Sequence, residues 1–98
     1  MEAKEFAVKQ ALDATERTGE LTDREKHLIG LAVCVTRGCS SCTARRLQAA
    51  LEAGIPYSSI VAAIDLAAAV NAGVVLRTAI QGASQGGVPC QGAECKAS

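Results

Sequence analysis

The sequence has almost no aromatic residues, with one Phe, one Tyr and no Trp among 98 residues. Aromatic side chains bury large areas, so here Ala, Val, Leu and Ile have to supply most of the core. Small domains also bury a lower fraction of their surface than large ones. We therefore expect a thin core within one chain, and a homo-oligomer that gains stability by assembly.

The chain also lacks net charge, because ten acidic side chains balance ten basic ones. This balance argues against partners recruited by charge, so we expect no nucleic acid and no membrane partner. The longest apolar tract, residues 60–76, is interrupted by Asp65 and Asn71. It is shorter than the roughly 20 residues that cross a bilayer, so it predicts a buried core helix.

No apolar leader segment stands at the N-terminus, where charged residues recur throughout residues 1–20. We therefore expect a cytoplasmic protein. In that compartment the five cysteines do not predict a static disulfide framework, and redox, catalytic or metal-binding roles come forward. A small core residue remains the alternative for each cysteine, and it is the preferred one for Cys34 within the apolar stretch "LAVCV".

Neither β-type alternation nor an internal repeat is present, whereas apolar residues recur at helical spacing. Thr22 and Glu25 have the spacing of a capping box, and Gly38 and Gly54 are suited to end helices. The predicted helices span residues 3–17, 22–38, 40–54 and 56–81. The sequence thus predicts an all-α domain over residues 1–82, followed by a flexible Gly- and Cys-containing tail over residues 83–98.

Two cysteines, Cys39 and Cys42, lie in "GCSSCTARR" at the first turn of the third predicted helix. Free backbone N–H groups and the helix dipole favour a thiolate there, so we expect a lowered thiol pKa. The spacing also lets the two sulfurs form a disulfide, with one thiol attacking and the other resolving. Two small residues at a tight helix junction are the alternative.

The run "LTDREKHLIGLAVCVTRGCSSCTARRLQAALEAGIPYSSIVAAI" resembles the carboxymuconolactone decarboxylase family, in particular its AhpD-like alkylhydroperoxidase branch. The resemblance covers residues 21 to about 80. It implies an all-α fold assembled into trimers or hexamers, with a dithiol that reacts with peroxides or with disulfides such as lipoyl groups. It also implies that Cys42 is the attacking thiol and that Cys39 resolves the intermediate.

The chain departs from the family pattern at two positions of its proton relay. His27 stands where the family has a glutamate, and Arg46 stands where it has a histidine. Arginine stays protonated, so Arg46 can stabilise a thiolate but cannot accept its proton. We hypothesise that His27 is the base for Cys42 while Arg46 holds the thiolate. The alternatives are a structural hydrogen bond for His27 and, for Arg45 and Arg46, a solvated helix face.

The tail adds Cys90 and Cys95, separated by four residues. A dithiol on a flexible arm predicts a redox relay that exchanges with Cys39 and Cys42. The alternative is a structural or sensing zinc site with four thiolate ligands, Cys39, Cys42, Cys90 and Cys95, because zinc favours such a set.

The predicted function is peroxide reduction or disulfide exchange through a disulfide between Cys39 and Cys42, reset by an external dithiol reductant. No organic cofactor is implied. Decarboxylation of a muconolactone-type acid is the least favoured alternative, because that branch of the family does not require a CxxC pair. A non-catalytic assembly protein with the same fold is another.

Overall fold

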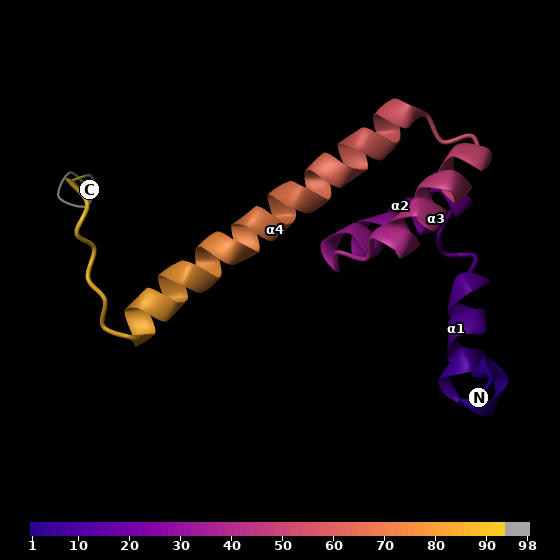
Figure 1. Ribbon diagram of the computed structural model, residues 1–98, viewed down its shortest axis with the longest axis horizontal. Coiled ribbons are helices and arrows are strands. Elements are labelled where there is room, and N and C mark those ends of the chain that lie inside the picture. Colours follow the sequence, from indigo (N-terminus) through magenta and orange to yellow (C-terminus); the bar gives the residue numbers. More distant parts are fainter. Residues whose placement is uncertain (94–98) are drawn as a thin grey trace. The chain divides into compact units, whose positions relative to one another are not determined.

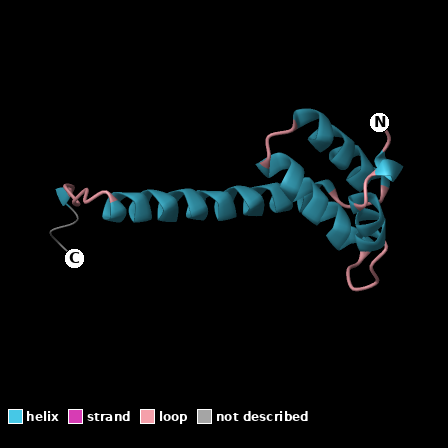
Figure 2. Cartoon of the chain, turned by 90° about the horizontal axis from the view of Figure 1, so that it is seen from below, coloured by secondary structure: helices cyan, strands magenta, loops and turns pink. Residues whose placement is uncertain are grey.

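The structure is a computed structural model that describes residues 1–93. Helices and loops make up this part of the chain, and no strand occurs in it (Figure 2). The elements are the 3₁₀ turn η1 (Ala3–Glu5) and the helices α1 (Val8–Glu16), α2 (Asp23–Thr36), α3 (Ser40–Glu52) and α4 (Tyr57–Gln85) (Figure 1). The all-α prediction is confirmed, although the helix expected over residues 3–17 divides into η1 and α1.

Helix α2 begins with the predicted capping box. The Glu25 amide donates to Thr22 Oγ1 at 3.1 Å, and the Thr22 amide donates to Glu25 Oε1 at 2.8 Å. These hydrogen bonds satisfy two backbone N–H groups that a helix start otherwise leaves unpaired. Bonds from the Thr22 backbone and side chain lower the pKa of the Glu25 carboxyl.

Helix α2 ends at a glycine in a left-handed backbone conformation, which a residue without a side chain adopts most easily. Gly38 has φ of +74°, and its amide donates to Val35 O at 3.1 Å. The next amide, that of Cys39, donates to Cys34 O at 3.3 Å. This pair of bonds is a Schellman motif, which reverses the chain so that α3 packs against α2.

The core is small and lies where α2, α3 and the start of α4 meet. Its buried residues are Leu31, Ala50, Ile55 and Ile60, with Leu28, Val35, Leu47 and Ile64 partly buried around them. Residues 28–35 are apolar on nearly every side of α2 and so predict a largely buried helix, but only Leu31 is buried in it. The prediction was wrong because α2 packs mainly against one neighbour, α3, so only one of its faces is covered.

The chain divides into two compact units, residues 1–64 and residues 65–98. In the second unit, α4 continues to Gln85 with its apolar side chains exposed, including Leu66, Val70 and Val74. The prediction of a core helix is therefore wrong for the single chain. By length and composition α4 meets the requirements for crossing a membrane, and the core helix of a soluble protein meets them as well.

Candidate dithiol site at the start of α3

Cys39 is the N-cap residue of α3, where a serine, threonine or aspartate is more usual. Its Sγ accepts a hydrogen bond from the Cys42 amide at 3.3 Å. A second contact joins Cys39 Sγ to Ser41 Oγ at 3.6 Å. The sulfur of Cys39 therefore occupies the position in which a helix start stabilises negative charge.

The two thiols of the pair are free, and they differ in acidity. Hydrogen bonds from the Cys42 side chain and backbone, and then from Ser41, lower the pKa of Cys39. The hydrogen bond to Cys39 and the nearby Cys39 charge raise the pKa of Cys42. Loss of the first proton from the pair is therefore easier at Cys39 than at Cys42. The family resemblance, in contrast, assigns the attacking role to Cys42.

Two further groups act on Cys42. The charge of Cys34, on the last turns of α2, contributes to the raised pKa of Cys42, whereas the cation of Arg45 lowers it. The sequence had favoured a solvated helix face for Arg45. Its influence on Cys42 follows from its place one turn along α3, a relation that helical spacing could have shown.

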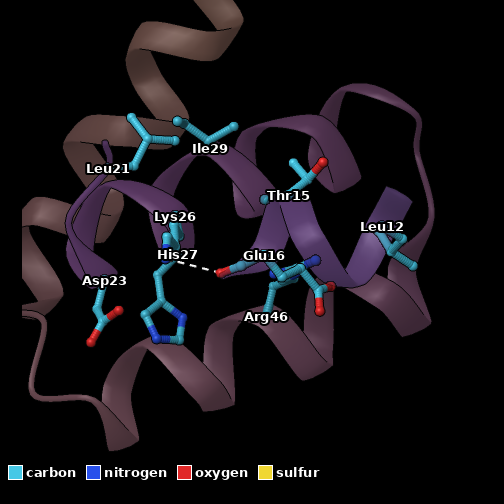
Figure 3. A pocket seen from close by; sticks show the side chains of 10 residues that line it. Leu12, Thr15, Glu16, Leu21, Asp23, Lys26, His27, Ile29 and Arg46 are labelled. Carbon is cyan, nitrogen blue, oxygen red and sulfur yellow. Dashed lines mark hydrogen bonds between the residues drawn. The ribbon is translucent and has the colours of Figure 1, made fainter. Parts of the chain in front are cut away.

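His27 and Arg46 lie together in a pocket of about 410 Å³ that neither cysteine lines (Figure 3). The pocket is open to solvent and is lined by residues of α1, α2 and α3 and by Leu21 of the loop between α1 and α2. Lys26 of α2 lines the pocket, and its Nζ donates a hydrogen bond to the backbone oxygen of Glu16, the last residue of α1, at 2.9 Å (the dashed line in Figure 3). The structure therefore brings the two departures from the family relay into one pocket, and neither Cys39 nor Cys42 is among its lining residues.

Arg46 is placed there by a glycine on the neighbouring helix. A Cβ atom at Gly30 would lie 2.5 Å from Nη1 of Arg46 and 2.7 Å from its Cζ. The guanidinium thus lies directly over the α2 backbone, in space that any other residue at position 30 would fill. In the sequence, Gly30 only interrupts the apolar pattern of this helix, so nothing local indicates the contact with Arg46. The role of Arg46 toward the Cys42 thiolate stays a prediction.

A model of the carboxymuconolactone decarboxylase family matches residues 2–85. The chain belongs to this family. A protein from Methanobacterium thermoautotrophicum with a known crystal structure is 39% identical in sequence to this chain. The match covers 76% of this chain and 84% of that one, with a TM-score of 0.70. No curated protein matches the chain.

Membership of the carboxymuconolactone decarboxylase family confirms the resemblance seen in the sequence. The family match ends at residue 85, where α4 also ends, so it includes the dithiol, the pocket and all four α-helices of the described part. The roles of Cys39, Cys42 and His27 within the family pattern stay predictions.

Of the two tail cysteines, the structure describes Cys90. Cys90 is disulfide-bonded, and Cys95 lies outside the described residues. A disulfide sulfur is not a thiolate ligand, so Cys90 in this state does not complete the alternative zinc site. Within residues 1–93, no group of three or more His, Cys, Asp or Glu residues is arranged to hold a metal. The relay between tail and core stays a prediction.

Proposed function

We propose that this protein is a dithiol oxidoreductase that cycles between two free thiols and a disulfide at Cys39 and Cys42. The observation that carries the proposal is the hydrogen bond from the Cys42 amide to Cys39 Sγ at 3.3 Å. It brings the second cysteine of the pair to the first and stabilises the thiolate form of Cys39, which is the nucleophile in thiol chemistry. Cys42 is solvent-exposed and Cys39 partly so, which gives a substrate access.

In disulfide exchange, the Cys39 thiolate attacks one sulfur of the substrate disulfide, and the other sulfur leaves as a thiolate. Cys42 then passes its proton to the substrate thiolate that has left and attacks Cys39 Sγ. The second substrate thiolate leaves, and Cys39 and Cys42 are joined. The substrate has gained two electrons, which the pair has lost.

In peroxide reduction, the Cys39 thiolate attacks the peroxide and becomes a sulfenic acid, while the alkoxide that leaves takes up a proton. Cys42 then attacks the sulfenic sulfur, and water is released as the disulfide forms. Each turnover consumes two thiols and one peroxide and yields one alcohol and one water. An external dithiol reduces the disulfide and becomes oxidised itself, and such reductants are available in the cytoplasm.

The order of attack proposed here, Cys39 first, differs from the order that the family resemblance implies. Its basis is an asymmetry of the backbone, because Cys39 is the N-cap and accepts the Cys42 amide. Cys42 is the third residue of the helix, and its side-chain hydrogen bond to Cys39 raises the pKa of Cys42. His27 and Arg46 have no step in this cycle, since both line a pocket that the dithiol does not enter.

The test oxidises the reduced full-length protein with one equivalent of tert-butyl hydroperoxide or of a small disulfide, followed by peptide mapping. We expect a linkage between Cys39 and Cys42. With Cys42→Ala, a sulfenic acid or a mixed disulfide should accumulate on Cys39, whereas Cys39→Ala removes the proposed attacking thiol and should leave no disulfide within the pair. Cys34→Ala is the matched control, and it should keep both linkage and turnover. Unlinked cysteines after complete consumption of oxidant would contradict the proposal.

We also propose that the protein works as a homo-oligomer, trimer or hexamer, assembled through α4. Only four hydrophobic side chains are buried in the described part of one chain, while large apolar residues along α4 are exposed. A core of this size stabilises a chain poorly, and a contiguous apolar helix surface is typical of an interface between subunits. Packing α4 against copies of itself supplies the missing burial.

A further inference from the structure

We propose that the pocket between α1, α2 and α3 is a binding site for a small organic carboxylate, with Arg46 as the residue that binds its charge. This site goes beyond the proposed thiol chemistry and does not depend on it, because neither Cys39 nor Cys42 lines the pocket. Four observations carry the proposal. They are the volume of the pocket, its apolar wall, the position of the Arg46 guanidinium and, within residues 1–93, the lack of an ion-pair partner for Arg46.

The volume of about 410 Å³ falls in the range of pockets that hold small molecules. Leu12, Leu21 and Ile29 line it and are between 38% and 52% exposed. An apolar ligand body that covers these side chains removes their hydrocarbon surface from water, which stabilises the complex. The pocket therefore favours a ligand with an apolar body over an inorganic ion.

The Arg46 guanidinium lies against the α2 backbone, in the space that a side chain at Gly30 would occupy. Within residues 1–93 the ion pairs are Lys4 with Glu2 and Lys9 with Asp13, so Arg46 is not in one there. Lys26, the other permanent cation of the pocket, already donates to the Glu16 carbonyl oxygen. Arg46 is thus the cation in this pocket with its hydrogen-bond donors free for a ligand.

A carboxylate on an apolar body matches this arrangement. The planar guanidinium presents pairs of N–H donors that fit two carboxylate oxygens at once. Its position over Gly30 places the guanidinium at the pocket, where the head of a ligand can reach it. The carboxylate of such a ligand would bind Arg46, and its apolar part would contact the leucine and isoleucine side chains of the pocket.

Two carboxylates of the protein, Glu16 and Asp23, also line the pocket and oppose a bound anion. Both side chains are exposed to solvent, where water and salt weaken their repulsion of a ligand. A bidentate bond to Arg46 at short range outweighs this longer-range effect. Glu16 is nevertheless a competitor for Arg46, and its removal should tighten ligand binding.

The experiment titrates the reduced full-length protein with sodium hexanoate by calorimetry, with 1-hexanol and inorganic phosphate as matched probes. We expect hexanoate to bind with a Kd on the order of 1 mM, typical of a ligand of this size. Hexanol, which lacks the charge, and phosphate, which lacks the apolar body, should each bind at least about tenfold more weakly. Equal affinity for hexanoate and either probe, or no saturable hexanoate binding, would overturn the proposal.

Three variants locate the binding charge. Arg46→Gln should weaken hexanoate binding about tenfold or more, whereas Arg45→Gln removes the same charge from the adjacent position and should leave binding within about twofold. Glu16→Gln should strengthen it. If Arg45→Gln and Arg46→Gln weaken binding equally, the effect is one of overall charge and the site is disproved.

Gly30→Ala tests the position of the Arg46 guanidinium without removing its charge. The added methyl group meets the far end of the flexible Arg46 side chain, which can move away, and alanine is a better helix former than glycine. The variant should therefore fold at least as stably as the parent, by thermal unfolding, while binding hexanoate at least about fivefold more weakly. Unchanged hexanoate affinity in Gly30→Ala would show that the guanidinium seat has no part in binding.

Discussion

The backbone amide of Cys39 donates to the carbonyl oxygen of Cys34 at 3.3 Å, which joins the end of α2 to the start of α3. Cys39 therefore has two structural roles, as the last residue of the motif that ends one helix and as the N-cap of the next. Its carbonyl oxygen also accepts from Thr43 Oγ1 at 2.7 Å. With its backbone bonded on both sides, the Cys39 sulfur has little freedom, and the reactivity of the pair depends on the helix junction.

The first prediction concerns Gly38, whose positive φ makes that junction. Gly38→Ala should destabilise the protein by about 1–2 kcal/mol, because an L side chain is strained in the left-handed region. It should also slow alkylation of Cys39, since the N-cap moves. Urea unfolding followed by circular dichroism measures the stability. Gly19→Ala is the control, because Gly19 has ordinary φ and open space around it, and its effect should stay within about 0.5 kcal/mol.

The second prediction is the pH dependence of the two thiols. A thiol reacts as its thiolate, so a lowered pKa keeps Cys39 reactive toward iodoacetamide at lower pH, and its reactivity falls only as the pH drops through that lowered pKa. Cys42, with a raised pKa, should become reactive only at a higher pH. Site-resolved mass spectrometry across a pH series gives both midpoints.

A control for this experiment removes the thiol donor. Cys42→Ala keeps the backbone amide but takes away the side-chain hydrogen bond, so the pKa of Cys39 should rise toward that of an ordinary thiol. Ser41→Ala, which removes a lesser contribution, should raise it less. A midpoint for Cys42 below that of Cys39 would restore the order of attack that the family resemblance implies.

The third prediction separates two adjacent arginines. Arg45→Gln should raise the pKa of Cys42 further, because the lost cation no longer favours its thiolate. Arg46→Gln should leave the alkylation midpoint of Cys42 unchanged, since Arg46 lies over Gly30 in the pocket. His27→Ala should likewise leave that midpoint unchanged. A shift caused by His27→Ala would support the hypothesis that this imidazole is the base for Cys42.

The fourth prediction concerns assembly through α4. Val70 and Val74 are one turn apart, 60% and 58% exposed, so Val70→Asp with Val74→Asp places two charges in the proposed interface. We expect light scattering after gel filtration to show an oligomer for the parent and mainly monomer for this variant. Gln81→Glu with Ser84→Asp adds the same charge at polar positions and should remain assembled. A monomeric parent, or one that partitions into lipid vesicles, would contradict the proposal.

Helix boundaries were largely readable from the sequence because their determinants are local. Thr22 with Glu25 starts α2, and Gly38 and Gly54 end α2 and α3, each through hydrogen bonds to residues within five positions. The pairing of Cys39 with Cys42 was readable for the same reason. Which of the two thiols has the lowered pKa was not readable, because an N-cap sulfur and the sulfur of the third helical residue differ only in the backbone donor each receives.

The sequence by itself thus determined the all-α class, the start and end of α2, and a dithiol at the first turn of α3. Tertiary structure decided where Arg46 lies, since its place depends on Gly30 of a neighbouring helix, 16 positions away in the chain. It also decided that α4 has its apolar side chains exposed in a single chain. Hydrogen bonds that cap a helix connect near neighbours, whereas the seat of a long side chain and the burial of a helix face depend on which segments pack together.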